Sequence, residues 1–153
     1  MISLVNHPFD PAETLRDFTA EASDAGAIVS FTGQVRPTAK SGPVSCLHLQ
    51  AYSPLTENGM RAAVETARRR WPISAVRVIH RIGDMAPGEA IVFVATASAH
   101  RRAAFEAADF LMDYLKTEAV FWKKETGPAG AAWIEPRAED YEDRARWALS
   151  GDN

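Results

Sequence analysis

The chain has 153 residues, of which 46% are hydrophobic and 24% are charged, and its formal net charge is −3. This composition is typical of a globular domain and excludes a disordered chain and a coiled coil. The length predicts one domain. The longest stretch of the second half without charge or proline is 90–99, far short of the roughly 20 residues that span a bilayer. Because no block of positive charge is present either, we expect no binding to membranes or nucleic acid.

The single cysteine, Cys46, cannot form a disulfide within the chain. The N-terminal run MISLVNHPFD lacks the basic start and apolar stretch of a secretory signal, so we expect a cytoplasmic protein. Cys46, His7 and His48 do not have the spacing of metal ligands. We therefore expect no metal and no cofactor.

Helix and strand patterns follow one another along the chain without an internal repeat. Asp10 has the character of an N-cap and precedes Pro11, which predicts a first helix that ends before Gly26. Strands are predicted over 27–32, 44–52, 76–82, 91–97, 120–125 and 132–134, and further helices over 56–70 and 100–117. This order is not a strict βαβ alternation, so the sequence predicts an α+β fold rather than a doubly wound sheet.

Several local features sharpen this assignment. The apolar run over 91–97 predicts a central strand that is covered on both faces. Ser98 follows it and is the expected N-cap of the helix over 100–117. The glycine-containing pairs at 83–84 and 87–88 predict turns.

Three of the four lysines fall within nine residues. Lys116 lies near the end of a predicted helix, where a cation is favourable for structural reasons alone. Strand alternation places Lys123 and Glu125 on one face with Phe121, and Lys124 on the other. Lys123 and Glu125 are therefore either a surface ion pair or an active-site lysine that a carboxylate orients and tunes.

A second basic group is the predicted helix start at His100, Arg101 and Arg102. Free backbone N–H groups make a helix start an anion site, but cations there oppose the helix dipole, which favours a functional role over simple solvation. Arg36 follows a strand and can bind a carboxylate or phosphate with two hydrogen bonds. For His80 a structural role is favoured. Together these residues predict a basic pocket for an anionic small molecule and leave the reaction open.

The motifs that carry these residues resemble one known family. The runs FTGQVR, VIHRIGDMAPGE, SAHRRAAFEAADFLMDYLKTEAVFWKKE and the later WIE closely resemble the large, catalytic subunit of molybdopterin synthase. The resemblance is specific over about 27–137 and loose over the first 25 residues and the charged tail, 138–153. It implies a single-domain, hammerhead-type α+β fold over 1–153, with a mixed or antiparallel sheet and packed helices.

The resemblance also implies an activity and partners. The family converts cyclic pyranopterin monophosphate to molybdopterin, the organic part of the molybdenum cofactor. The sulfur comes from the C-terminal thiocarboxylate of a small ubiquitin-like subunit, whose Gly-Gly tail enters a pocket on the large subunit. The implied assembly is a heterotetramer, in which a central homodimer carries one small subunit at each end.

Site residues follow from the resemblance position by position. Lys116 and Lys123 match the family's two functional lysines, for which we expect catalytic roles. The expected substrate-binding residues are Gln34, Val35, Arg36, His100, Arg101, Lys124 and Glu125, and the expected pocket-lining residues are Phe31 and Met112. Gln34 departs from the family pattern, in which lysine is frequent, so the anion contact of this loop depends on Arg36.

Two other functions compete with this interpretation. A phosphoester-binding transferase built on His100 and Arg101 would bind simple nucleotides without a partner protein. A non-enzymatic scaffold would use the lysines to dock an acidic partner tail, and its complex would survive replacement of Lys116 with alanine.

Overall fold

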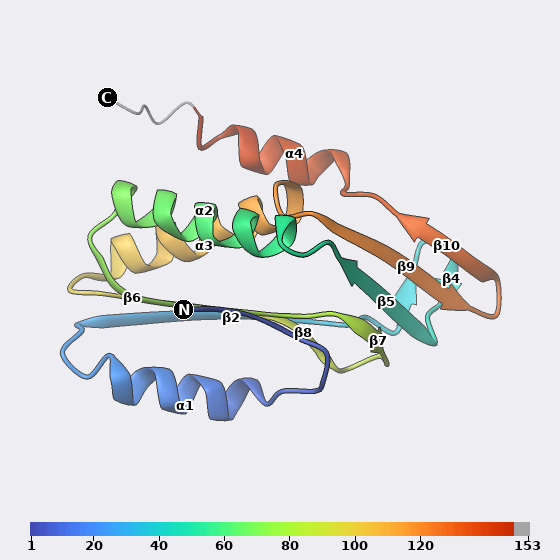
Figure 1. The fold of residues 1–153 in the computed structure, drawn as a ribbon, viewed down its shortest axis with the longest axis horizontal. Coiled ribbons are helices and arrows are strands. Elements are labelled where there is room, and N and C mark those ends of the chain that lie inside the picture. The colour runs from blue at the N-terminus through green and yellow to red at the C-terminus, as the bar shows by residue number, and fades with distance from the viewer. Residues whose placement is uncertain (149–153) are drawn as a thin grey trace.

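The computed structural model describes residues 1–148 (Figure 1). Its first sheet has the strand order β1-β6-β8-β2. The strands are β1 (Ile2–Val5), β6 (Ile73–Arg81), β8 (Ala90–Ser98) and β2 (Ala27–Gln34). β1 pairs with β6 in parallel, and the other pairs are antiparallel. β2 therefore lies at one edge of a mixed sheet.

Helices cover both faces of the first sheet. The helix α1 (Pro11–Glu21) lies on one face, and α2 (Leu55–Arg70) and α3 (Arg101–Thr117) lie on the other (Figure 1). A fourth helix, α4 (Ala138–Ala145), packs on the outer side of α3. No helix within 1–148 is long and apolar enough to cross a membrane.

A second sheet projects from one end of the first (Figure 1). Its strands, in the order β10-β9-β5-β7, are β10 (Gly130–Ile134), β9 (Phe121–Gly127), β5 (Cys46–Ala51) and β7 (Gly83–Met85), and all its pairs are antiparallel. A small hairpin of β3 (Thr38–Ala39) and β4 (Gly42–Pro43) lies between β2 and β5 in the chain. The α+β fold with mixed and antiparallel sheets and packed helices is confirmed.

The core has separate layers on the two faces of the first sheet. Val78, Val94 and Phe110 belong to the larger cluster, which joins the sheet to α2 and α3. Phe18 and Phe93 belong to the smaller one, under α1. Because successive residues of β8 point into alternate layers, this strand is covered on both faces, as its apolar sequence predicts.

The helix starts show one confirmed and one wrong expectation. The Asp10 carboxylate accepts a hydrogen bond from the Ala12 backbone at 2.9 Å, so Asp10 is the predicted N-cap of α1. Ser98, however, is the last residue of β8, and His100 is the N-cap of α3. The buried Ser98 hydroxyl donates to the Pro72 carbonyl at 2.9 Å and accepts from the His100 backbone at 3.4 Å, so it joins the strand end to the start of α3 without being the N-cap residue itself.

The pair 83–84 is not a simple turn. Gly83 has a φ of +88°, which only glycine adopts readily, and it begins β7, which pairs with β5. The strand β1 was not predicted, because it is a short edge strand with no fully buried residue. The charged tail 138–153 begins with α4, and its residues 149–153 lie outside the described chain.

Candidate active site

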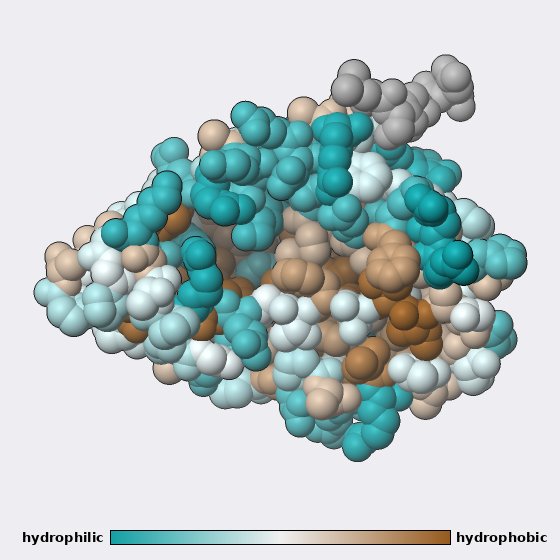
Figure 2. Space-filling view, turned by 180° about the vertical axis from the view of Figure 1, so that it is seen from behind, coloured by the Kyte–Doolittle hydropathy of each residue, from teal (hydrophilic) through white to brown (hydrophobic). Residues whose placement is uncertain are grey.

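A cavity opens where the end of β2 meets the second sheet. It is lined by Gln34, Val35, Arg36, Thr38, Val44, Leu47, Ile91, Lys123 and Glu125. Five of these nine are predicted site residues, and they come from segments almost 90 residues apart in the chain. Seen from behind, the molecule has a hollow bordered by hydrophilic side chains on the side that carries the second sheet (Figure 2).

The backbone around Val35 fixes the β2 side of this cavity. Val35 is buried, its N–H donates to the Glu89 carbonyl at 2.9 Å, and its carbonyl accepts from Gly88 at 2.8 Å. The register between β2 and β8 shifts just before Gln34. This irregularity ends the regular pairing and lets Arg36 leave the sheet toward the cavity.

Lys123 and Glu125 form the opposite wall, on the inner face of β9. The Lys123 ammonium lies 3.9 Å from a carboxylate oxygen of Glu125, and the two side chains are 36% and 14% exposed. Burial lowers the pKa of Lys123, the charge of Glu125 opposes this shift, and the positive charges of Lys116 and Arg36 add to it. The result is a lysine that gives up its proton more readily than a lysine in water.

Lys116 reaches the same region from the last turn of α3, and its side chain is exposed. Its charge influences Lys123 and also a residue that the sequence did not single out, Asp140 of α4. Burial disfavours the charged form of Asp140, but hydrogen bonds from Arg137 and the charge of Lys116 outweigh it and hold the pKa of this carboxyl below its usual value. The sequence pattern does not single out Asp140, because this residue lies in an acidic stretch that is typical of a solvent-exposed tail.

Phe31 and Met112, the expected lining residues, lie on elements that border the site. Met112 is half-buried on α3, one turn before Lys116, and packs against the larger core cluster. Phe31 lies on the edge strand β2 and is 43% exposed. The set of residues lining the cavity includes neither of them.

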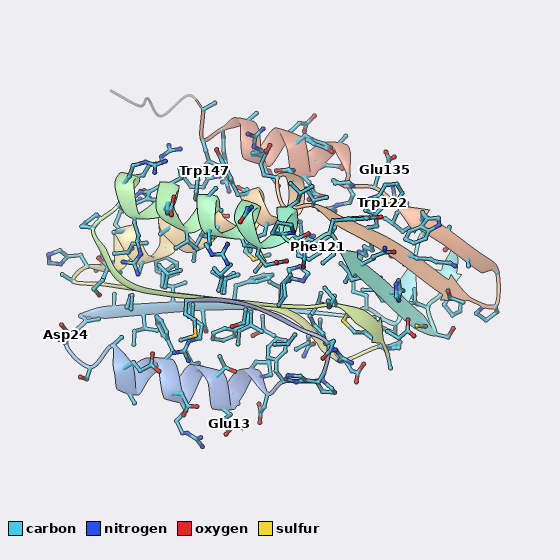
Figure 3. The ribbon with its side chains drawn as sticks, viewed as in Figure 1. Glu13, Asp24, Phe121, Trp122, Glu135 and Trp147 are labelled. Carbon is cyan, nitrogen blue, oxygen red and sulfur yellow. The ribbon has the colours of Figure 1, made fainter. Side chains whose placement is uncertain are left out.

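Lys124 lies away from the cavity. Its ammonium is 5.5 Å from the ring centroid of Trp133, which pairs with it on β10. Trp122, two residues earlier, is on this same outer face and is 52% exposed. Phe121 and Trp122 leave β9 on opposite sides (Figure 3), so the alternation expected for this strand is confirmed.

His100 and Arg101 also lie away from the lysines. They stand at the start of α3, whereas Lys116 stands near its end, and a helical rise of 1.5 Å per residue separates His100 from Lys116 by about 24 Å. The single chain therefore has two basic regions, at opposite ends of α3, rather than the one pocket that the sequence suggested.

His80 has the structural role that the sequence favoured. Its ring stacks on Phe121 with 4.0 Å between centroids, and its Nδ1 lies 3.0 Å from the Arg81 carbonyl, to which it donates. Burial lowers the pKa of His80 to about 4; the hydrogen bond to Arg81 opposes this shift, and the charge of Lys116 adds to it. The ring is therefore neutral at pH 7 and supports the strand that carries Lys123.

Comparison with known proteins identifies the family. The family model described as "MoaE protein" matches residues 4–118. A molybdopterin synthase catalytic subunit from Caulobacter vibrioides is 47% identical over 147 residues, which cover 96% of this chain and 97% of the relative. The Escherichia coli protein of the same name is 47% identical over 140 residues, with coverages of 92% and 93%.

A solved structure agrees with these sequence matches. The molybdopterin biosynthesis MoaE protein from Burkholderia ambifaria superposes with a TM-score of 0.81 and is 38% identical, and the match covers 97% of each chain. Sequence and fold thus agree over almost the whole length of the chain. The resemblance seen in the sequence is confirmed, and the chain belongs to the MoaE family of molybdopterin synthase catalytic subunits.

Proposed function

We propose that this chain is the catalytic subunit of a molybdopterin synthase that transfers sulfur to cyclic pyranopterin monophosphate. The donor is the C-terminal thiocarboxylate of a small ubiquitin-like subunit. The observation that supports this function best is that Arg36 and Lys123, from segments far apart in the chain, line one cavity, with the charge of Lys116 close enough to lower the pKa of Lys123. The free thiol of Cys46 fits a location in the cytoplasm.

The cavity suits a reaction between two anions. Both the thiocarboxylate and the phosphate of the substrate are negatively charged, so fixed positive charge must hold them together. Arg36 and the two lysines supply that charge from three different segments of the chain. Gln34 adds a hydrogen-bonding group but no charge.

The transfer needs two proton-controlled steps for each sulfur atom. The sulfur bonds to a substrate carbon as an oxygen leaves that carbon, and water then cleaves the acyl–sulfur bond and releases the partner's tail as a carboxylate. In this proposal Lys116 binds the thiocarboxyl oxygen and stabilises its charge as the acyl group is released. Lys123, oriented by Glu125, gives a proton to the leaving oxygen and regains it from the water that attacks.

A second copy of the chain would complete the site. β2 is an edge strand, and its Ala27 pairs with Ser98, just before His100 and Arg101, whereas its Gln34 end borders the cavity. Two β2 strands that meet antiparallel about a two-fold axis would place the Ala27 end of one beside the Gln34 end of the other. His100 and Arg101 would then bind the substrate in the partner's cavity. A small subunit at each end of this homodimer gives the proposed heterotetramer.

The experiment that tests the function is a reconstituted synthesis. The purified chain is mixed with a thiocarboxylated small subunit and cyclic pyranopterin monophosphate, and dithiolene product is measured. We expect product with the thiocarboxylate and none when the tail ends in an ordinary carboxylate. If the small subunit binds and no product forms, the assigned reaction is wrong for this chain.

A further inference from the structure

The last residue of β6 is an arginine that is almost completely buried. The side chain of Arg81 is 7% exposed, and it takes no part in the proposed reaction. Its Nη2 donates to the Asp84 carbonyl at 3.1 Å, and its Nη1 lies 3.2 Å from the Oε2 atom of Glu89. Because withdrawing a charge from water is costly, these contacts must offset the burial, and they hold the guanidinium in one place.

Glu89 extends this contact to the turn that precedes β8. The same Oε2 atom accepts from the Ala86 backbone at 2.6 Å, and the Glu89 N–H donates to the Ala86 carbonyl at 3.1 Å. Gly88 has a φ of +86°, in the left-handed region that favours glycine. Residues 86–89 therefore form a tight turn that is closed by its own last side chain and is fixed to β6 by Arg81.

The turn in its place holds the residue before Arg36. The Val35 N–H donates to the Glu89 carbonyl at 2.9 Å, and the Val35 carbonyl accepts from Gly88 at 2.8 Å. The regular register of β2 with β8 is lost just before Gln34, so these two bonds replace the sheet pairing at this point. They form the backbone anchor from which Arg36 enters the cavity.

Arg81 is also connected to the opposite wall of the cavity. Asp84, whose carbonyl accepts from Arg81, lies in β7 and pairs with His48 of β5. Leu47 of the same strand lines the cavity, and β5 is the neighbour of β9, which carries Lys123. One buried guanidinium thus joins the end of β2 to the second sheet, and the cavity lies between these two parts.

Another arginine of β6 makes a similar pair away from the cavity. Arg77 stands four residues before Arg81, on the same face of the strand, and its side chain is 12% exposed. It binds the carboxylate of Glu21, the last residue of α1. Neither Arg77 nor Glu21 lines the cavity, so this pair shows what an ion pair of the first sheet does for stability alone.

We infer that Arg81 and Glu89 are positioning residues for Arg36. They hold the turn over 86–89, and the turn holds Val35 and so sets the place from which Arg36 binds the anionic substrate. This inference rests on the proposed function, because it concerns the substrate contact of that reaction. A guanidinium binds a phosphate with two hydrogen bonds only in a fixed geometry, so a backbone displacement of about 1 Å is enough to weaken the contact.

The test compares the glutamates of the two pairs. Glu89→Ala removes the carboxylate that closes the turn, and Glu89→Gln keeps an oxygen that can accept from Ala86 and Arg81. Glu21→Ala is the matched control, because it removes the same group from the pair with Arg77. Thermal unfolding checks that all three variants are folded. If Glu89→Ala does not fold, Glu89→Gln takes its place in both measurements.

The first readout separates KM from kcat. We expect Glu89→Ala to raise the KM for cyclic pyranopterin monophosphate about tenfold and to leave kcat within about threefold, since a binding contact is weakened. Glu89→Gln should raise KM only about threefold, and Glu21→Ala should keep the KM of the wild type. A wild-type KM in Glu89→Ala, or equal increases in Glu89→Ala and Glu21→Ala, would overturn the inference.

The arginine is tested by the same measurement. Arg81→Lys keeps the charge but lacks the planar fork that reaches two acceptors, so we expect it to raise KM at least about threefold. Arg77→Lys is its control on the same strand and should keep the KM of the wild type. If the two lysine variants have the same KM, Arg81 serves stability alone and the inference fails.

The second readout does not depend on turnover. Hydrogen exchange of the Val35 and Gly88 amides, followed by NMR, reports whether the turn still holds the end of β2. We expect faster exchange of both amides in Glu89→Ala and wild-type rates in Glu21→Ala. Unchanged exchange in Glu89→Ala contradicts the inference even if the wild type makes no product, which is the result that would instead contradict the proposed function.

Discussion

Lys123 and Lys124 are neighbours in the chain, and their ammonium groups lie on opposite faces of β9. Lys123 lines the cavity beside Glu125, whereas Lys124 lies over the ring of Trp133 on the outer face. Strand alternation separates them completely. The pair therefore offers a cavity-lining lysine and its control one position apart.

This arrangement predicts different effects for one substitution at two positions. Lys123→Arg keeps the positive charge but introduces a group that does not lose its proton near neutral pH, so we expect kcat to fall roughly 100-fold or more. Lys124→Arg should leave kcat within about twofold, since Arg also stacks on an aromatic ring. Steady-state kinetics of both variants with the thiocarboxylated partner measures this. Equal losses would show that the two faces of β9 share one function.

The lowered pKa of Lys123 also predicts the direction of a pH effect. Because burial favours the neutral amine, the uncharged fraction of Lys123 at a given pH is larger than that of a lysine in water. The proposed reaction needs the protonated amine, which gives its proton to the leaving oxygen, so with rising pH the activity should begin to fall below pH 10.5, the value for a free side chain. Glu125→Gln removes the charge that opposes this shift, and its pH–rate profile should move further toward low pH. A shift toward high pH would contradict the assigned pairing.

The separation of His100 and Arg101 from the lysines predicts complementation between two inactive chains. We expect Arg101→Ala and Lys123→Ala each to be inactive alone. In a mixture of equal amounts that exchanges subunits, half of the dimers are mixed and one of their two sites is intact, so about a quarter of the activity should return. Unfolding and refolding the variants together, followed by the product assay, tests this. No recovery in a mixture that forms mixed dimers would place all site residues in one chain.

His80 predicts how stability depends on pH. The pKa of His80 is about 4 in the folded protein and 6.5 for an unperturbed ring, so the unfolded chain binds the proton more tightly. The contribution of the neutral ring is complete above pH 6.5 and is lost as the pH falls from 6.5 to 4, amounting to about 3 kcal/mol. Urea unfolding at several pH values measures it. His80→Phe retains an aromatic ring against Phe121, and its free energy of unfolding should no longer fall with pH between 6.5 and 4 on account of this residue. His7→Gln, at an exposed histidine, should keep the pH dependence of the wild type.

Gly127 predicts a coupling between the second sheet and the loop beside the cavity. A Cβ atom at this position would collide with the Pro43 carbonyl, which belongs to the backbone and cannot move aside cheaply. We expect Gly127→Ala to displace β4 and to lower both the melting temperature and kcat. Gly42 has open space around it but a positive φ, so Gly42→Ala should cost only the local strain of about 1 kcal/mol. A Gly127→Ala protein with normal activity would show that the position of β4 does not matter for the reaction.

The sequence correctly predicted the strands in which the pattern of apolar and polar residues alone determines the structure. The run over 91–97 is apolar at almost every position, and it forms the doubly covered strand β8. The alternation of Lys123 and Glu125 against Lys124 was also readable, because a strand has only two faces.

Other features could not be predicted, because they depend on how distant segments pack together and not on the local sequence. Nothing near Asp140 in the sequence indicates burial, which results from α4 folding back onto α3. His100 and Lys116 are sixteen residues apart and belong to similar basic motifs, but the straight helix between them prevents one chain from using both at one site. Serine is a frequent N-cap residue, but the Ser98 hydroxyl donates to the Pro72 carbonyl beside the neighbouring strand.

The four tryptophans occupy two separate places, and this gives the protein a built-in optical reporter. Trp71 and Trp147 meet edge to face with 5.5 Å between ring centroids, where the end of α4 rests on α2 and α3 (Figure 3). Trp122 and Trp133 form a similar contact at 5.8 Å on the outer face of the second sheet. Each pair is close enough for coupled transitions in near-ultraviolet circular dichroism. Replacing Trp133 with Phe would leave a spectrum dominated by the pair at α4, so that undocking of this helix could be followed directly while substrate or the small subunit is added.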